Sequence, residues 1–258
     1  MSRLDNKVAI ITGGGSGMGR EISILFAEQG AKVVVADWNE ESGEETVGII
    51  QELGGRVVFA KVDVTKPKEV KEMVNIASNN YGRPDILCCC AGVLGETTLL
   101  TECSEANFTT VMEINLKGVW LCMKYAIPKM IKTGGGSIIN ISSIASELAQ
   151  RGESIYSASK AAVQSMSQVA AVEFAADDIR VNCIQPGLVL TAMAKKALEN
   201  APEIMEQWKV VSPMGDAITP EEIAQLALFL ASDESLHLTG QAVALDGGYK
   251  INSNFHLC

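Results

Sequence analysis

The feature that most constrains this chain is a glycine-rich turn set between an apolar run and a helical pattern. Residues 7–12 are rich in β-branched and other apolar side chains, and the turn after them contains Gly13, Gly17 and Gly19. Glycine lets the backbone approach a pyrophosphate closely, and the N-terminus of the following helix offers free N–H groups and the positive end of its dipole. A strand, a glycine turn and a helix in this order predict a dinucleotide-binding unit over residues 7–30.

A carboxylate stands where such a unit needs one. The second β-rich run, residues 32–36, ends in Asp37, which follows Gly19 by 18 residues (37 − 19). The usual interval before a ribose-binding carboxylate is about 20 residues. A carboxylate accepts hydrogen bonds from both ribose hydroxyls of NAD and repels the 2′-phosphate of NADP, and the next residue, Trp38, is not basic. The sequence therefore predicts NAD as the cofactor.

Strand and helix patterns alternate along the rest of the chain. The expected helices cover residues 40–53, 67–81, 104–132, a stretch around Tyr156 and residues 220–231, and the expected strands cover residues 56–62, 85–89, 137–143, 179–185 and 242–245. This alternation predicts parallel strands with right-handed crossovers and helices on both faces of the sheet. A chain of 258 residues fits one domain, 1–258. Residues from about 191 to 218 lose clear periodicity and are a candidate substrate lid.

One pair of side chains suits proton transfer. Tyr156 and Lys160 lie four residues apart in an Ala- and Ser-rich stretch, so on a helix they share one face. A phenol titrates near 10, and we expect the ammonium, together with the positive charge of a bound oxidised nicotinamide, to lower that pKa. Tyr125 and Lys129 have the same spacing, but a methionine stands 13 residues before Tyr125, whereas Ser143 stands 13 residues before Tyr156. The neighbouring serine does not have this spacing.

A strand-end serine ahead of a Tyr–Lys helix, together with the glycine turn and Asp37, resembles the short-chain dehydrogenase/reductase family. The resemblance covers the chain from Lys7 to about Tyr249. It implies an α/β fold, a single doubly wound Rossmann-type domain whose seven-stranded parallel sheet has helices on both faces. It also implies reversible hydride transfer between NAD(H) and a secondary alcohol or its ketone. Such proteins are usually homotetramers joined through two long helices and the C-terminal region.

The same resemblance implies roles for individual side chains. Tyr156 would carry the hydroxyl proton, Lys160 would lower its pKa and bind the nicotinamide ribose, Ser143 would hydrogen-bond the substrate oxygen, and Asn115 would support a water relay. Asp63 and its neighbour would receive the adenine, and a Pro-Gly turn at 186–191 would hold the nicotinamide amide and the phosphates. The full implied set of cofactor contacts is Gly13, Ser16, Gly17, Met18, Gly19, Asp37, Trp38, Asp63, Val64, Cys90, Ala91, Gly92, Tyr156, Lys160, Pro186, Gly187, Val189 and Thr191.

Two positions of the chain bear on how the cofactor is held. Ser16 stands at a position of the glycine loop where phosphate-binding relatives often carry a base, which again favours NAD. Cys89 and Cys90 stand where the family usually has two asparagines. A thiol is a weak donor and cannot replace an amide, so this departure puts cofactor affinity or local stability in doubt.

Composition excludes several classes of function. The net charge is −10 and the pI is about 4.8, which argues against a nucleic-acid surface. There is no run of 18 apolar residues to span a membrane, and the first residues are too polar for a secretory signal. The seven cysteines are an odd number without C-x-x-C spacing, so no metal site is expected. We expect a cytoplasmic protein in which Cys88, Cys89 and Cys90 point to alternate faces of a strand as small apolar groups.

The segments expected to wall the substrate pocket are apolar. Residues 93–99, 144–155, 188–193 and the lid out to Met214 are dominated by Leu, Ile, Val, Ala and Met. Such pockets favour bulky apolar ligands with one or two oriented polar groups, so we expect a cyclic, aromatic or steroid-like alcohol or ketone. A 3-oxoacyl thioester reductase and a non-catalytic dinucleotide-binding sensor remain as alternatives. A serine hydrolase is rejected, because the chain has only His237 and His256 and no G-x-S-x-G elbow.

Overall fold

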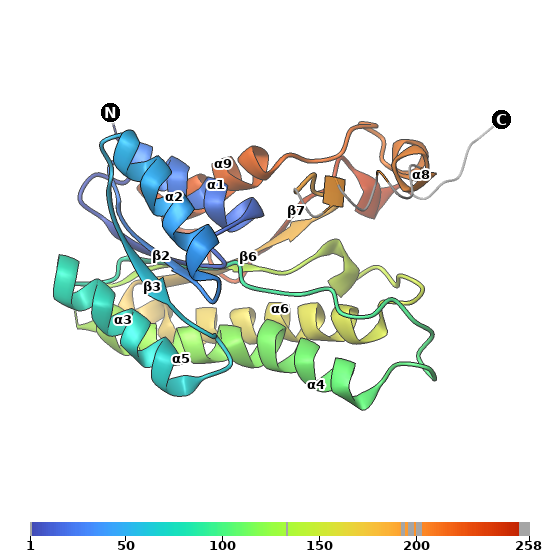
Figure 1. The fold of residues 1–258 in the computed structure, drawn as a ribbon, viewed down its shortest axis with the longest axis horizontal. Helices are drawn as coiled ribbons and strands as arrows, with labels where there is room; N and C mark the ends of the chain where they lie inside the picture. Colours follow the sequence, from blue (N-terminus) through green and yellow to red (C-terminus); the bar gives the residue numbers. More distant parts are fainter. Residues whose placement is uncertain (1, 133, 192–193, 196–198, 200–202, 253–258) are drawn as a thin grey trace.

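The computed structural model describes residues 2–132, 134–191, 194–195, 199 and 203–252. The predicted lid falls partly outside these residues, and Met193 is one of those left out. Within the described part of the chain, seven parallel strands form one sheet in the order β3-β2-β1-β4-β5-β6-β7. Helices cover both faces of this sheet, with α1, α2 and α9 on one side and α3, α4, α5 and α6 on the other (Figure 1). The predicted fold class is therefore confirmed.

The elements lie close to their predicted positions. The strands are β1 (Val8–Thr12), β2 (Lys32–Asp37), β3 (Arg56–Lys61), β4 (Ile86–Cys89), β5 (Gly136–Ile141), β6 (Ile179–Pro186) and β7 (Ala242–Leu245). The helices are α1 (Gly17–Glu28), α2 (Glu40–Glu52), α3 (Pro67–Tyr81), α4 (Glu105–Met112), α5 (Gly118–Ile131), α6 (Ser154–Phe174), α8 (Glu203–Val211) and α9 (Pro220–Ala231). Among the described residues, no helix is long and apolar enough to cross a membrane.

Two predictions from the sequence need correction. The helix expected over 104–132 is interrupted by one π-helical turn, Glu113–Lys117, between α4 and α5. The segment expected to be irregular contains the helix α8, whose Trp208 is 8% exposed. The sequence around α8 lacks the periodic apolar pattern that predicts a helix, because α8 buries the ring of Trp208 rather than a continuous apolar stripe.

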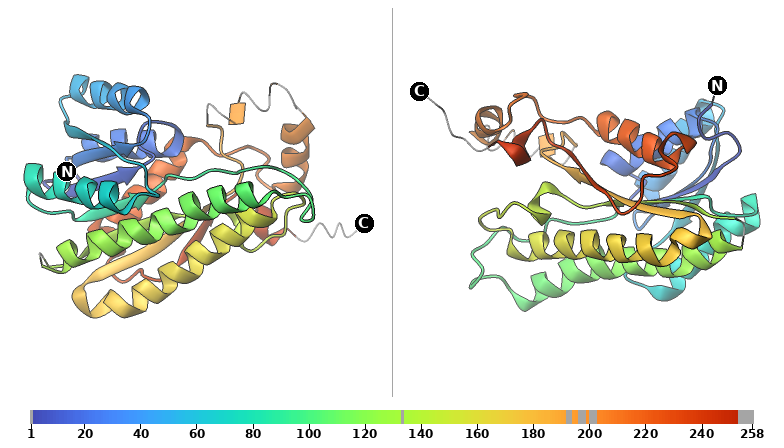
Figure 2. Two further views of the ribbon diagram at one scale, coloured as in Figure 1. Left: turned by 60° about the horizontal axis from the view of Figure 1, so that its bottom comes forward. Right: turned by 180° about the vertical axis from the view of Figure 1, so that it is seen from behind.

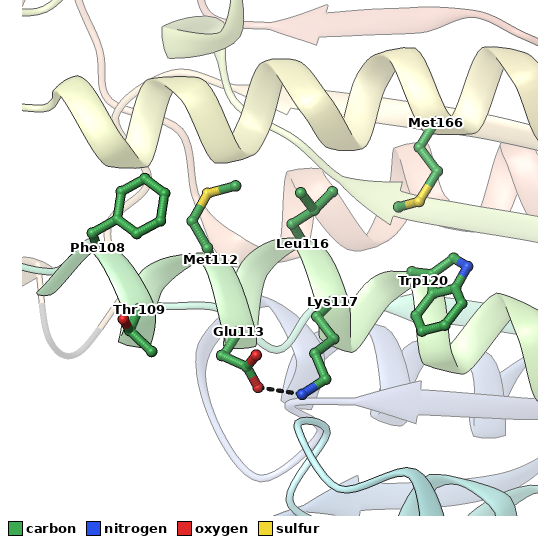
Figure 3. Close-up of a pocket in the computed structure, with 8 residues that line it drawn as sticks. All are labelled: Phe108, Thr109, Met112, Glu113, Leu116, Lys117, Trp120 and Met166. Atoms are coloured by element: carbon green, nitrogen blue, oxygen red, sulfur yellow. Dashed lines mark hydrogen bonds and ion pairs between the residues drawn. The ribbon is translucent and has the colours of Figure 1, made fainter. Parts of the chain in front are cut away.

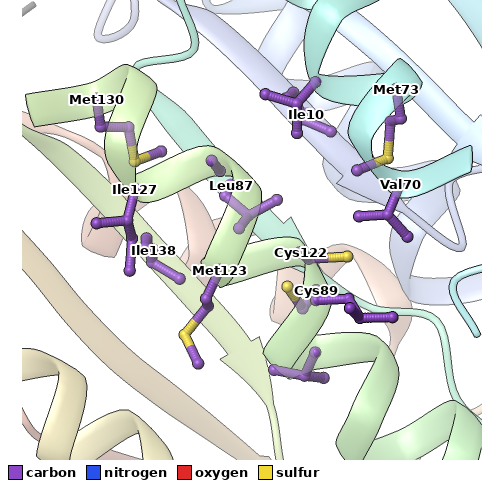
Figure 4. Packing of buried hydrophobic residues seen from close by; sticks show 14 of the residues in the cluster. Ile10, Val70, Met73, Leu87, Cys89, Cys122, Met123, Ile127, Met130 and Ile138 are labelled. Atoms are coloured by element: carbon purple, nitrogen blue, oxygen red, sulfur yellow. The ribbon is translucent and has the colours of Figure 1, made fainter. Parts of the chain in front are cut away.

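The sheet separates two apolar cores. Buried residues of β1, β4 and α5 pack on the side of α3, α5 and α6, as Figure 4 shows for Ile10, Leu87 and Met123. The cysteines of β4 follow the predicted alternation, since Cys88 lies in the core toward α1 and α9 and Cys89 lies in the opposite core. Both thiols are free and buried, which confirms their prediction as small apolar groups.

The order of the strands places the site. From β1 the chain adds β2 and β3 on one side of the sheet, and from β4 it adds β5, β6 and β7 on the other side. The loops after β1 and β4 therefore lead to opposite sides, and in open parallel sheets ligands bind at the carboxyl ends of the strands at such a point. The hydroxyl of Thr12, the last residue of β1, accepts hydrogen bonds from Cys90 N at 3.2 Å and Ala91 N at 3.3 Å. Thr12 is fully buried, so this hydroxyl holds the two diverging loops at a fixed separation.

We predict that Thr12→Val destabilises the fold. Valine keeps the shape of threonine but removes the hydroxyl acceptor. Cys90 N keeps its hydrogen bond to the Thr12 carbonyl, so Ala91 N is the donor that loses its partner, and leaving a buried donor unpaired costs about 1–3 kcal/mol. The free energy of unfolding from urea titration measures this loss. The exposed Thr110→Val in α4 is the matched control and should change the value by less than about 0.5 kcal/mol. Equal effects of the two substitutions would contradict this account.

Candidate active site

The glycine turn is a tight cradle at the start of α1. Gly13 has φ +67°, and a Cβ there would lie 2.8 Å from Ala91 N, while a Cβ at Gly19 would lie 2.2 Å from Gly13 O. Only glycine fits at either position. No acidic side chain stands in the first turn of α1, and among the described residues no side chain caps it at Ser16. The first N–H groups of α1, including those of Gly17 and Met18, are therefore available for a pyrophosphate.

Asp37 stands at the ribose end of this cradle. Its side chain is buried at the end of β2, where Oδ2 accepts from Gly15 N and Oδ1 accepts from Asn39 N, both at 2.9 Å. The next side chain, Trp38, is 74% exposed. The guanidinium of Arg20 is already engaged by the Gly15 carbonyl and by Glu45. Lys61, the neighbour of Asp37 on β3, pairs with Glu40 at 2.9 Å. Within the described part of the chain, a fixed carboxylate stands here beside bases that acidic partners already engage, which fits a dinucleotide whose ribose carries free hydroxyls.

The loop after β3 carries Asp63 and Val64, the two residues that the family resemblance implies as adenine contacts. The carboxylate of Asp63 accepts from Thr65 N and Thr65 Oγ1, so it forms a local turn as an ordinary Asp would. Val64 packs against Gly118, where an added Cβ would lie 2.8 Å from Val64 Cγ2. Both residues lie at the carboxyl end of β3, and no contact of either distinguishes an adenine site from a structural turn.

The structure shows how the chain accommodates Cys90. Its backbone N–H is bonded to Thr12, and its side chain packs against the apolar core on the α1 and α9 side. Burial raises the pKa of its thiol to about 12, while the charge of Lys160 acts in the opposite direction. The tie between β1 and β4 thus uses main-chain donors and a threonine. This tie does not depend on the side chain at position 90, and the effect of Cys90 on local stability and cofactor affinity stays a prediction.

Asn115 lies at the π-helical turn and is fully buried. Its Nδ2 donates to Val93 O and its Oδ1 accepts from Val93 N, each at 2.8 Å, and Nδ2 also lies 3.1 Å from Ser159 Oγ. The asparagine thus clamps the chain just after β4 and joins it to α6. A Cβ at Gly92 would lie 3.2 Å from Asn115 Oδ1 and 3.4 Å from Lys160 Nζ, so a larger residue here would crowd the Asn115 side chain.

Ser143, Tyr156 and Lys160 are brought together as predicted. Ser143 follows β5, its hydroxyl accepts from Ala145 N at 3.1 Å, and it lies near enough to the Tyr156 hydroxyl to lower the pKa of that tyrosine. On α6, Lys160 Nζ lies 5.6 Å from the centre of the Tyr156 ring and donates to Ile141 O at 2.8 Å. Ser142 is turned away, since its hydroxyl donates to the Lys160 carbonyl at 2.9 Å.

The side chains alone shift the two pKa values differently from the expectation. Burial raises the pKa of Tyr156, the Ser143 hydrogen bond lowers it, and the negative charge of Glu153 raises it further. Burial lowers the pKa of Lys160 to about 8. Burial, the largest of these causes, keeps the pKa of Tyr156 above its ordinary value in the protein alone, so the expected lowering, which includes the charge of a bound oxidised nicotinamide, stays a prediction. From the sequence, Glu153 is a charged residue that could lie at the rim of the pocket, and the structure places its charge near Tyr156.

The turn after β6 reaches back to the glycine cradle. Gly187 N donates to Leu245 O at 2.9 Å, which extends the pairing of Pro186 with β7. Val189 forms an isolated parallel β-bridge with Ile218, which lies shortly before α9. A Cβ at Gly17 would lie 3.2 Å from Thr191 Cγ2, so Thr191 stands beside the N-terminus of α1, where its hydroxyl can reach a phosphate.

The fold, the glycine cradle and the Ser–Tyr–Lys cluster agree with what comparison finds. A family model described as enoyl-(acyl carrier protein) reductase matches residues 13–250. The chain belongs to the short-chain dehydrogenase/reductase family of oxidoreductases. It is 39% identical to the 3-oxoacyl-[acyl-carrier-protein] reductase FabG of Thermotoga maritima, over 96% of this chain and all of that protein.

Two other similar proteins have names that refer to ring compounds. The chain is 35% identical to the cyclohexanol dehydrogenase of an Acinetobacter species, over 96% of each protein. A solved 7α-hydroxysteroid dehydrogenase, complexed with NADH and 7-oxo glycochenodeoxycholic acid, is 36% identical and superposes with a TM-score of 0.91 over 95% of each chain. Each is a protein to which this short-chain dehydrogenase/reductase is similar.

We predict that Tyr156→Phe removes turnover while NADH binding stays nearly normal. The ring is kept and only the proton-carrying hydroxyl is lost, and general acid–base catalysis typically contributes 10²–10⁴-fold. Turnover and NADH affinity are measured on the same preparation. Tyr125→Phe is the matched control, because Tyr125 also precedes a lysine by four residues, Lys129. Retention of more than about a tenth of wild-type turnover would exclude Tyr156 as the proton carrier.

A second prediction concerns pH. Glu153→Gln removes a negative charge that raises the pKa of Tyr156, so the phenolate forms at lower pH. The rise of kcat with pH for alcohol oxidation should therefore shift to lower pH. Glu173→Gln, an exposed position at the far end of α6, should leave the profile in place. A shift to higher pH would show that Glu153 does not act on the tyrosine through its charge.

Proposed function

We propose that this protein is an NAD(H)-dependent oxidoreductase that interconverts a bulky apolar secondary alcohol and its ketone. The observation that carries the cofactor assignment is Asp37, buried and anchored to Gly15 N at the edge of the glycine cradle. A carboxylate held there meets a free ribose favourably and a 2′-phosphate unfavourably. The bound nicotinamide would supply the hydride acceptor or donor.

The chain's own residues account for the proton. The Tyr156 hydroxyl gives its proton to the ketone oxygen in reduction, and the Tyr156 phenolate takes the proton from the alcohol in oxidation. Ser143 hydrogen-bonds the substrate oxygen and favours the phenolate. Lys160 keeps a buried ammonium beside the tyrosine and reaches the nicotinamide ribose. Asn115 fixes the backbone after β4, and we propose that a water held there links Lys160 to solvent. The fixed positions of these groups lower the reorganisation needed in the transition state.

Apolar side chains support a bulky substrate. The segment after β4 exposes Val93, Leu94 and Leu99, and it is joined to the loop after Ser143 because Thr98 N donates to Gly152 O at 3.0 Å. Met214, beyond α8, is 79% exposed. Cyclic substrates named for the cyclohexanol and hydroxysteroid dehydrogenases agree with walls of this kind. Many hydroxyls, as in a sugar, would lack partners among them.

A second candidate is reduction of a 3-oxoacyl thioester. The relative that favours it is the 3-oxoacyl-[acyl-carrier-protein] reductase of Thermotoga maritima, 39% identical over its whole length. The net charge of −10 opposes the docking of a phosphate-bearing carrier. A non-catalytic sensor on the same fold is the third reading, and the joint presence of Ser143, Tyr156 and Lys160 opposes it.

The cofactor prediction is that kcat/KM is higher with NAD than with NADP. Asp37→Ala should narrow this difference, because it removes the charge that repels the 2′-phosphate. The exposed Glu41→Ala in α2 serves as the control for a lost acidic side chain near this edge. Equal use of NAD and NADP by the unmodified protein would overturn the assignment.

The substrate prediction is tested on one panel under one set of conditions. We expect kcat/KM to be higher for a hydroxysteroid or a cyclohexanol derivative than for a polyol or an acetoacetyl thioester. Production or consumption of NADH absorbance measures each reaction. The proposal fails if the polyol or the thioester is the best substrate by about tenfold or more, which corresponds to roughly 1.4 kcal/mol of transition-state binding. No turnover of any member would favour the sensor.

We also propose that the protein is a homotetramer. A groove of about 580 Å³ runs along α4, the π-helical turn and α5, beside α6, and it is lined by Phe108, Thr109, Met112, Glu113, Leu116, Lys117, Trp120 and Met166 (Figure 3). The helices α4, α5 and α6 lie side by side on the same face of the sheet (Figure 2). Exposed Phe108 and Trp120 suit a helical face that another copy covers. Sedimentation velocity measures the state, and a monomer at micromolar concentration contradicts the proposal.

A further inference from the structure

A polar network lies behind the loop that carries Ser143, and the proton chemistry above does not use it. Its centre is Gln185, the residue before the end of β6, which is fully buried. Gln185 Nε2 lies 2.8 Å from Ser146 Oγ, 2.9 Å from Glu147 Oε1 and 2.8 Å from Gln164 Oε1. Because a buried amide needs such partners, it fixes Ser146 and Glu147 relative to the sheet.

An ion pair adds charge to this network. The ammonium of Lys250 pairs with the carboxylate of Glu147 and also donates to Gln185 Oε1 at 3.1 Å. Lys250, and then Gln185 and Gln164, hold the pKa of Glu147 at about 2, well below its usual value. Lys250 is partly buried and Glu147 is exposed, with side-chain exposures of 25% and 36%. The carboxylate of Glu147 is ionised at neutral pH, and its hydrogen bonds from Gln185 and Gln164 fix the pair in one geometry, which an isolated surface pair lacks.

One end of the network reaches the catalytic serine. The Ser146 hydroxyl donates to Ser143 O at 2.6 Å, and Ser146 N donates to the same carbonyl at 3.0 Å. The hydroxyl of Ser143 accepts from Ala145 N at 3.1 Å and lies near enough to the Tyr156 hydroxyl to lower the pKa of that tyrosine. A displacement of Glu147 and Ser146 would therefore move the backbone that aims the Ser143 hydroxyl.

The other end reaches α8. Asp246 accepts from Lys250 N at 2.7 Å and shapes the turn before it. The neighbouring Tyr249 places its ring 5.2 Å from that of Trp208 on α8, and Val211 at the end of α8 accepts from Asn252 Nδ2 at 2.8 Å. Residues 246–252 thus form one bracket between α8 and the Ser143 loop.

We propose that Glu147 and Lys250 are positioning residues whose ion pair holds the Ser143 hydroxyl in line with Tyr156 by locking the serine loop to the bracket under α8. The inference rests on the proposed dehydrogenase function and adds two residues that touch neither cofactor nor reacting atoms. Neither residue belongs to the set that the family motifs identify. The role requires the charge of the pair, not only the bulk of the two side chains.

Turnover of the best panel substrate tests the proposal. Glu147→Gln and Lys250→Met should each lower kcat by roughly tenfold or more, since small misplacements of catalytic groups have effects of this size, with the affinity for NADH unchanged. The kcat of the double variant should be no lower than that of the less active single variant, because the two residues act as a unit. Lys250→Arg keeps the charge and should restore most of kcat. Lys209→Met, which breaks an exposed pair with Glu206 on α8, is the matched control and should act like wild type.

Several outcomes would overturn the proposal. They are a rise in KM alone, additive losses in the double variant, equal effects of Lys250→Arg and Lys250→Met, or an equal effect of Lys209→Met. A fall in thermal stability with kcat unchanged would show a purely structural role. The first outcome would mean that the bracket serves α8 and substrate binding only.

A titration that needs no turnover separates this inference from the proposed function. The Ser143 hydrogen bond lowers the pKa of Tyr156, so a displaced serine leaves that pKa higher. The Tyr156 transition is read by ultraviolet difference absorbance, as the difference between each protein and its own Tyr156→Phe derivative. In Glu147→Gln it should move to higher pH than in the wild type, and in Lys209→Met it should not. An unchanged titration in Glu147→Gln overturns the inference, whether or not any alcohol is a substrate.

Discussion

The parallel pairing of β1 with β4 is the constraint on which the site depends. It brings the glycine turn after β1 and the chain after β4 to one edge of the sheet, and the Thr12 hydroxyl holds them together through Cys90 N and Ala91 N. Asn115 then clamps Val93, so the chain leaves β4 in a single direction. The cofactor cradle on one side and the proton-carrying tyrosine on the other are both placed against this fixed edge.

The burial of Lys160 is the second strong condition. An ammonium out of water is unfavourable unless it has partners, and here the Ile141 carbonyl receives one of its hydrogens. Burial lowers its pKa to about 8, so the charge is kept at neutral pH with a modest margin. Ser143 is the protein group whose hydrogen bond favours the Tyr156 phenolate. The contribution of Lys160 that the structure shows is an amino group 5.6 Å from the centre of the Tyr156 ring.

The C-terminal segment connects the two sides of the substrate region. Lys250 holds Glu147 and Gln185, and its neighbours hold α8, so the wall after Ser143 and the helix above the cleft share one support. Charged and amide groups carry this contact, and such groups specify one geometry more sharply than apolar packing does.

The sequence by itself determined the fold class, the cofactor cradle and the cluster of Ser143, Tyr156 and Lys160. These follow from local spacing, because strand and helix periods and glycine turns act over a few residues. Only the tertiary structure decided the π-helical turn at Asn115, the helix around Trp208, the direction of the Tyr156 pKa and the Glu147–Lys250 pair. Each depends on contacts between residues far apart in the chain, Glu147 and Lys250 among them. Burial and hydrogen-bond direction are set there, and spacing along the chain carries no record of either.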